Sequence, residues 1–203
     1  MEMEKSSYHH KDLKNALIEK GIELVATDGI HNFSIRKVAA ACGVSHAAPY
    51  SHFQSKEELL DAMQEHITNQ FSEILELTIK EHEHDPELLA YMGLAYATFF
   101  IRNPQYFSFL YSQSNFTIDL SLSTDGQSNY RPFEIYKDIV ISLLERTNYP
   151  KEKQKDAVIA MWSFIHGITS LATMKNVHYD EGWEQKIADF LAVFQSSFLN
   201  YRR

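Results

Sequence analysis

The stretch that most constrains the fold of this chain is residues 34–56, SIRKVAAACGVSHAAPYSHFQSK. Ser34 is a favourable N-cap for a first short helix, and Gly43 suits the left-handed residue that ends it. Ser45 can cap a second short helix that extends to His52. Two short helices with small apolar faces around a glycine-containing turn are typical of a helix-turn-helix.

The charges of this stretch indicate what it binds. No Asp or Glu occurs from Gly29 to Lys56, and the outer face of the second helix carries small or polar side chains. A helix that enters the major groove of DNA needs a slim, hydrogen-bonding face without acids. We therefore expect DNA contacts from Ser34, Arg36, Lys37, Ser45, His46, Ala47, Tyr50, Ser51, His52 and Lys56. The alternative is a helical hairpin inside a bundle, which would not need an acid-free outer face.

A further helix is predicted to begin directly after this stretch. Ser55 and Glu58 form a capping box, which places Lys56 in the first turn of the helix. A cation there opposes the helix dipole, whereas a phosphate of DNA would be bound by it. Lys56 is therefore either a phosphate contact or a solvated lysine, and Tyr50 is a second candidate phosphate contact. The apolar stripe continues to about residue 84, so this helix would connect the DNA-binding end to the rest.

Residues 43–60, GVSHAAPYSHFQSKEELL, resemble the signature of the TetR family of tetracycline-repressor-like regulators. The matching positions include Gly43, Tyr50, His52 and Lys56, whereas Pro49 stands where many members have Leu. The resemblance covers about the first third of the chain. It implies three N-terminal helices that bind DNA, followed by a larger domain for ligand binding and dimerisation.

The rest of the chain is also predicted to be helical. No strand alternation, internal repeat or glycine-rich phosphate loop occurs, so we expect an all-α fold of about nine helices. The predicted domains are 10–56 for DNA binding and 57–203 for ligand binding and dimerisation. Residues 112–130 are rich in Ser, Thr, Asn and Gly and are predicted to form a long flexible loop.

Composition limits the location and the partners. No run of about 18 apolar residues or N-terminal leader occurs, so no membrane association is predicted. The single cysteine, Cys42, excludes a disulfide framework and favours a reducing cytoplasm. The net charge is −8, but residues 1–56 hold seven Lys or Arg against six Asp or Glu. The acidity therefore lies outside the candidate DNA-binding region and favours contact with DNA through one end only.

Residues 161–171, MWSFIHGITSL, are the second informative motif. They resemble the Trp-x-x-x-His-Gly segment of one branch of TetR C-terminal domains. Gly167 in mid-helix predicts a close approach of another helix. We expect an effector pocket lined by aromatic side chains and a histidine: Phe99, Phe100, Tyr106, Phe107, Phe109, Trp162 and His166. The alternative for each of these residues is a place in the packed core.

These patterns favour a ligand-responsive transcriptional regulator. We expect a repressor that a small apolar or aromatic effector releases from a double-stranded DNA operator. Homodimerisation is expected through the last two helices, about 151–176 and 181–201, since two copies would form a four-helix interface. A dimer also matches DNA, whose two half-sites lie ~34–36 Å apart along the duplex.

The alternatives are an enzyme built on a helical bundle and a helical interaction module that does not bind DNA. No HExxH, GxSxG or paired Glu-x-x-His motif occurs. We therefore expect no catalysis, cofactor or metal.

Overall fold

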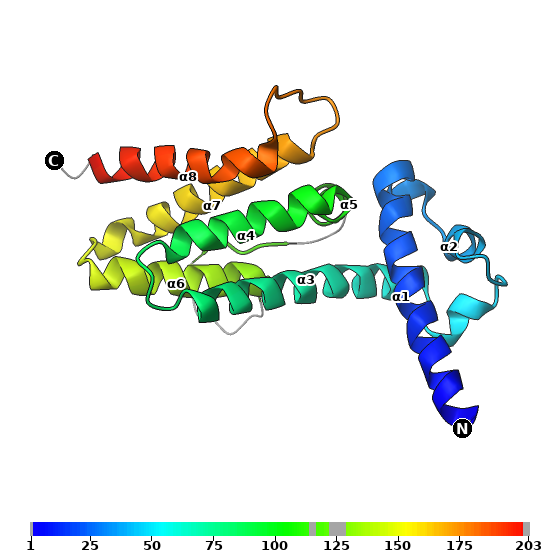
Figure 1. Ribbon diagram of the computed structural model, residues 1–203. Coiled ribbons are helices and arrows are strands. Elements are labelled where there is room, and N and C mark those ends of the chain that lie inside the picture. The colour runs from blue at the N-terminus through cyan, green and yellow to red at the C-terminus, as the bar shows by residue number, and fades with distance from the viewer. Residues whose placement is uncertain (1, 114–116, 122–128, 201–203) are drawn as a thin grey trace. The chain divides into compact units, whose positions relative to one another are not determined.

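The computed structural model describes residues 2–113, 117–121 and 129–200, and over these ranges the chain is helical without strands (Figure 1). The described α-helices are α1 (Glu2–Asp28), α2 (Ile35–Ala41), α3 (Lys56–Glu81), α4 (Leu88–Arg102), α5 (Pro104–Ser108), α6 (Arg131–Arg146), α7 (Lys151–Thr173) and α8 (Trp183–Asn200). Shorter turns are the 3-10 helices η1 (Ile30–Asn32) and η2 (Ala48–Ser51) and the π-helical turn η3 (Phe109–Gln113).

The all-α prediction is confirmed, but the described chain has eight α-helices instead of about nine. The difference is the second helix of the helix-turn-helix, which is the 3-10 turn η2. The long helix predicted to reach about residue 84 ends at Glu81. Most of the loop predicted for 112–130 lies outside the described residues, and residues 117–121 within it form no helix.

The chain divides into two compact units. Unit 1 contains residues 1–67 and 105–116, and unit 2 contains residues 68–104 and 117–203. The boundary between the compact units therefore falls inside α3, after Ile67, whereas the sequence predicts the functional domains to meet at residues 56 and 57. Unit 1 is also discontinuous, because it includes a segment that follows α4.

Unit 1 is built on α1, which contacts α2, η1 and η3. Its core consists of fully buried apolar side chains that recur at helical spacing, among them Leu17, Ile22, Val38, Phe53 and Met63. The returning segment, which is the part of unit 1 that follows α4 (residues 105–116), contributes Phe109 and Leu110, which are almost completely buried. Burial of such side chains stabilises each by about 1.5–3 kcal/mol, so this segment belongs to the core of unit 1.

Unit 2 is a helical bundle in which α4 contacts α7 and α8, and α6 contacts α7. An aromatic cluster lies at the junction of α3 and α4, where the Phe71 ring is 5.2 Å from each of the Tyr96, Phe99 and Phe100 rings. None of the described helices has both the length and the apolar character needed to cross a membrane.

Candidate nucleic-acid interface and effector cavity

The helix α2 forms as the sequence predicts. The Ser34 hydroxyl accepts a hydrogen bond from the Lys37 backbone N–H at 3.3 Å, as an N-cap does. Ile35, Val38 and Ala39 are buried, and α2 contacts α1. Arg36 and Lys37 therefore lie on the opposite, exposed face of the helix. Gly43 ends this element with a φ of +68°, a conformation that other residues rarely adopt.

The segment after Gly43 differs from the prediction. The backbone N–H of Ala48 donates to Ser45 O at 3.0 Å, and that of Tyr50 donates to Ala47 O at 3.2 Å. Both bonds span three residues, which defines a 3-10 helix. Pro49 explains this geometry, because it has no N–H to donate to the carbonyl four residues earlier and its ring crowds that carbonyl. Ser45 does not cap a helix with its side chain, since the N-cap position is Ala47.

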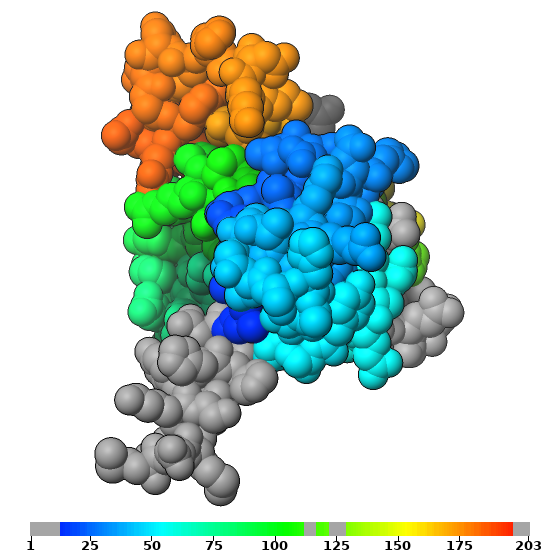
Figure 2. Space-filling model, turned by 90° about the vertical axis from the view of Figure 1, so that its right-hand side faces the viewer, coloured from blue at the N-terminus to red at the C-terminus, as the bar shows by residue number. Residues whose placement is uncertain are grey.

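The outward side of η2 remains accessible and without acids. Tyr50 is 54% exposed, and Ser45, His46, Ala47 and Ser51 are exposed as well. His52 is half-buried, with its ring 6.2 Å from that of Phe53. In Figure 2 the segment that contains α2 and η2, coloured sky-blue and cyan, lies at the surface that faces the viewer.

Both lysines predicted to contact DNA have partners within the chain. The Lys56 ammonium donates to Ile30 O at 3.1 Å and lies 5.6 Å from the centre of the Phe33 ring. Lys37 Nζ lies 3.8 Å from an Asp28 carboxylate oxygen, just outside the acid-free stretch. Lys56 therefore ties the start of α3 to η1, and a contact with DNA would use its remaining N–H groups.

The predicted capping box at the start of α3 is present. The Glu58 backbone N–H donates to the Ser55 hydroxyl at 3.1 Å, and the Glu58 carboxylate accepts from the Gln54 backbone N–H at 2.5 Å. The first bond satisfies a donor that the first turn of a helix leaves unpaired, and the second binds the residue before the N-cap in place of the N-cap N–H.

A polar cluster in unit 1 was not anticipated from the sequence. Glu19 Oε1 on α1 lies 2.7 Å from His66 Nε2 on α3 and 2.5 Å from the hydroxyl of Tyr106 on α5. The rings of His66 and Tyr106 also meet edge to face, with their centres 6.3 Å apart. Tyr106, which the sequence analysis assigned to the effector pocket, therefore holds α5 against α1 and α3.

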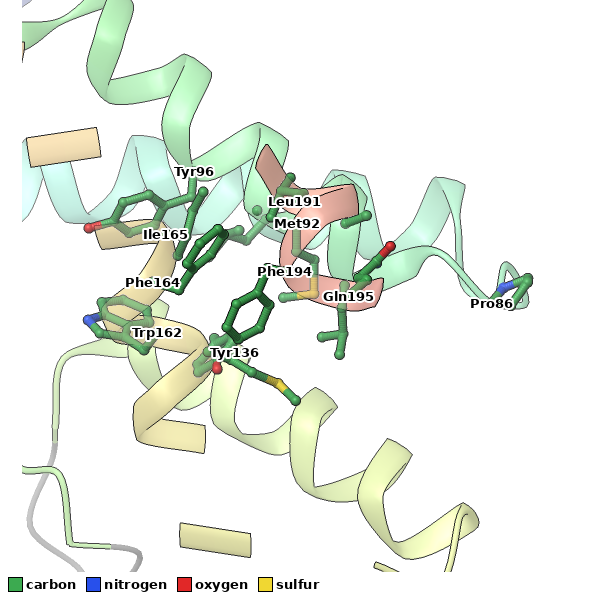
Figure 3. Close-up of a pocket in the computed structure, with 15 residues that line it drawn as sticks. Pro86, Met92, Tyr96, Tyr136, Trp162, Phe164, Ile165, Leu191, Phe194 and Gln195 are labelled. Carbon is green, nitrogen blue, oxygen red and sulfur yellow. The ribbon is translucent and has the colours of Figure 1, made fainter. Parts of the chain in front are cut away.

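Unit 2 contains a cavity of about 280 Å³. Its lining comes from α3, α4, α6, α7, α8 and the turn before α4, and is largely apolar or aromatic: Leu75, Pro86, Leu89, Ala90, Met92, Gly93, Tyr96, Tyr136, Met161, Trp162, Phe164, Ile165, Leu191, Phe194 and Gln195 (Figure 3). A Cβ built at Gly93 would lie 3.0 Å from a Leu191 methyl group, so this glycine permits the close approach of α4 and α8.

The predicted pocket residues are divided between several environments. Trp162 lines the cavity, whereas Phe99 and Phe100 pack around Phe71 outside the lining. Phe107 and Phe109 belong to unit 1 with Tyr106 and are buried there. The aromatic residues that follow Asn103 did not indicate that the boundary between the two compact units lies between residues 104 and 105.

His166 does not line the cavity but contacts a residue that does. Its Nδ1 is 2.8 Å from the hydroxyl of Tyr96, which lines the cavity. Burial lowers the pKa of His166, because a charged imidazole loses its hydration there. The spacing of Trp162 and His166 did not identify Tyr96 as the connecting side chain.

The close helix approach predicted at Gly167 is not present within the described chain. Gly167 is exposed, and no atom lies within 4 Å of a Cβ built on it. Among the described residues there is also no group of three or more His, Cys, Asp or Glu side chains arranged to hold a metal. The ring of His82 stacks on that of Tyr91, with the ring centres 3.7 Å apart.

The curated relatives include a bacterial regulator protein and a nucleoid occlusion factor. The chain is 32% identical over 74 residues to a fatty acid metabolism regulator protein of Bacillus subtilis, which covers 36% of this chain and 38% of that protein. It is 30% identical over 101 residues to the nucleoid occlusion factor SlmA of Salmonella paratyphi B, which covers 50% of this chain and 51% of SlmA. The chain thus spans about half or less of the length of these relatives.

Solved structures with the same fold match most of the chain. The TetR family transcriptional regulator PfmR of Thermus thermophilus has a TM-score of 0.64 and 22% identity, with 87% of this chain and 92% of that chain covered. The fatty acid degradation regulator FadR of Bacillus halodurans has a TM-score of 0.62 and 13% identity, with coverage of 89% and 93%. At these identities the likeness shows the fold.

Family models match both parts of the sequence. Residues 17–63 match the model of bacterial regulatory proteins of the tetR family, and residues 89–192 match a tetracyclin repressor-like C-terminal domain. Neither description mentions the Trp-His-Gly motif, so assignment to that branch remains a prediction. The second match alone covers half of the chain, and the protein therefore belongs to the tetR family of bacterial regulators.

Proposed function

We propose that this protein is a DNA-binding transcriptional regulator that represses its target until a small apolar or aromatic effector binds. The observation that carries this proposal is the acid-free, exposed face formed by α2 and η2, within a region that matches the tetR-family model. An exposed face without carboxylates can approach phosphates and base edges, which carry negative charge and hydrogen-bonding groups.

The exposed side chains suggest separate roles in DNA binding. Arg36 carries its charge on the outer face of α2, where it can pair with a phosphate or a guanine edge. Tyr50 presents an exposed hydroxyl as a phosphate donor, and His46 and Ser51 lie on the same short segment. Ala47 is small enough to permit close approach to a thymine methyl group.

A homodimer through α7 and α8 is the second part of the proposal. From Ala160 to the C-cap residue of α7, the exposed residues recur every three or four positions and are small or apolar: Ala160, Ser163, Gly167, Leu171 and Met174. On α8 the exposed residues include Ala188, Ala192, Val193 and Ser196, with Val193 65% exposed. Small residues permit close packing of helices, so a second copy would supply the approach that Gly167 lacks within one chain.

The effector would act through the chain connection between the cavity and unit 1. The helix α4 lines the cavity, and only Asn103 separates it from α5, whose Tyr106 binds Glu19 of α1. Effector binding that favours one position of α4 would shift the population of dimers with correctly spaced DNA-binding units.

The test is binding to DNA from upstream of the protein's own gene, measured by fluorescence anisotropy at two salt concentrations. Arg36→Ala is expected to reduce the slope of the logarithm of the binding constant against the logarithm of the salt concentration by about one, which corresponds to one phosphate contact. Tyr50→Phe is expected to weaken binding by about 1 kcal/mol. Lys155→Ala is the matched control, because Lys155 is exposed on α7 in unit 2. Equal binding by all these proteins, or no specific complex with the wild type, would refute the proposal.

A further inference from the structure

The lining of the cavity in unit 2 carries no formal charge. Among the described residues, the lining contains aliphatic, thioether and aromatic side chains and one amide, but no Lys, Arg, Asp, Glu or His. Five of the lining residues are aromatic: Tyr96, Tyr136, Trp162, Phe164 and Phe194. A ligand in this cavity would lose its hydration and gain mostly dispersion and ring contacts in return.

Two of the polar atoms at the lining already have partners. The Tyr136 hydroxyl donates to Val158 O at 2.8 Å, and the Tyr96 hydroxyl is bonded to His166 Nδ1 at 2.8 Å. The half-buried His166 is held in its neutral form by the lowered pKa and therefore supplies no positive charge behind Tyr96.

Two cations that flank the cavity on its lining helices are paired with carboxylates. Arg102, at the end of α4, pairs with Glu184. Lys186 on α8 binds Asp189 at 2.6 Å and lies 3.4 Å from Glu181. None of these charged groups lines the cavity, so an ionised effector would be buried there without a counter-ion.

Gln195 is the one amide of the lining. Figure 3 shows its side chain on one side of the apolar stretch, with the Tyr96 oxygen and the Trp162 nitrogen turned toward the opposite side. An amide both donates and accepts hydrogen bonds, so it can satisfy one neutral polar group of a ligand.

We propose that this cavity selects an uncharged effector with an aromatic or similarly compact apolar body and one neutral polar group. The inference rests on the proposed function, in which this cavity holds the effector. Its size supports a body of about two rings, because a cavity of roughly 150 Å³ already accepts benzene and this one measures about 280 Å³. Carboxylates and ammonium ions are excluded by the cost of burying an unpaired charge.

The test uses three probes of nearly equal shape, 2-naphthalenemethanol, 2-naphthoate and 2-naphthylmethylammonium, titrated by calorimetry into the full-length protein at pH 7.5. Naphthoate can enter as the neutral acid after taking up a proton, which at pH 7.5 and a carboxyl pKa near 4 limits the penalty to about 3000-fold. We expect naphthoate to bind about 100- to 1000-fold more weakly than the alcohol and to gain affinity as the pH falls. The ammonium should bind at least roughly 30-fold more weakly, since aromatic faces partly compensate its charge.

Two pairs of variants locate the site and its selectivity. Ala90→Phe fills the lining and should abolish binding of the alcohol, whereas Ala95→Phe, on the same helix but outside the lining, should preserve it. Gln195→Arg should strengthen binding of naphthoate by at least about tenfold through a charge-assisted hydrogen bond, and Gln195→Glu should do the same for the ammonium. Circular dichroism of each variant checks that it is folded.

Two outcomes overturn the inference. They are binding of either ion within about tenfold of the alcohol, and no binding of the alcohol up to its solubility limit. Anisotropy with operator DNA keeps this result separate from the proposed function. If the alcohol binds in the cavity but never affects DNA binding, the ligand class stands and the effector role fails. If an ion binds best and releases DNA, the regulatory function stands and the ligand class fails.

Discussion

The hydrogen bond from Tyr106 to Glu19 gives a quantitative test of how unit 1 is held together. Tyr106→Phe removes one hydroxyl and preserves a ring that is 96% buried, because its exposed fraction is 4%. A hydrogen bond to a charged group contributes about 1.5–3 kcal/mol. The Glu19 side chain is 40% exposed and retains His66 as a partner, so water replaces part of the loss. We therefore expect the free energy of unfolding to fall by about 1 kcal/mol, or a Tm lower by roughly 2–4 °C.

The assay is thermal and urea unfolding of the protein at fixed concentration, followed by circular dichroism. Tyr91→Phe is the matched control, since the Tyr91 hydroxyl makes no hydrogen bond to any described residue and its ring stacks on His82. A double-mutant cycle with Glu19→Gln isolates the pair, and we expect a coupling of at least about 0.5 kcal/mol. Coupling indistinguishable from zero, or an equal loss of stability in Tyr91→Phe, would show that this contact does not hold the returning segment to α1.

Three further predictions concern other elements. Gly43→Ala should lower the free energy of unfolding by about 1 kcal/mol because its φ is +68°, which denaturant titration measures. Leu171→Glu should convert the dimer to a monomer in sedimentation experiments, and an unchanged mass would contradict the proposed α7–α8 interface. The pKa of His166 is lowered from its ordinary value of 6.5, so the unfolded chain binds the proton more readily. Stability should therefore fall as the pH decreases below about 6.5, and His166→Gln should remove that part of the pH dependence.

Local signals in the sequence predicted the local structure of unit 1. The Ser34 cap, the Gly43 turn and the Ser55–Glu58 capping box all form, because each depends on residues within four positions of one another. The prediction of an α-helix after the turn was wrong, because the segment is the 3-10 turn η2. Pro49 has no N–H, and it stands where an α-helix would need a bond to the fourth preceding carbonyl.

The cavity was harder to predict because its lining depends on tertiary packing. An aromatic residue at helical spacing can face a cavity or a packed core, and Phe99 and Phe100 pack around Phe71. The two glycines show the same difficulty. Gly167 was expected to meet another helix, yet the close approach within the chain occurs at Gly93. Helical periodicity shows which residues share a face, but not which neighbour covers that face.

The discontinuity of unit 1 limits how this regulator can be re-engineered. A chimaera that joins residues 1–67 to the effector domain of another regulator would lack the Phe109 and Leu110 side chains that are buried against this unit. Such a hybrid would expose part of its hydrophobic interior and would need a grafted copy of residues 105–116 as well. Operator specificity should therefore be transferred by exchanging individual surface side chains of α2 and η2 while the scaffold of both units is preserved.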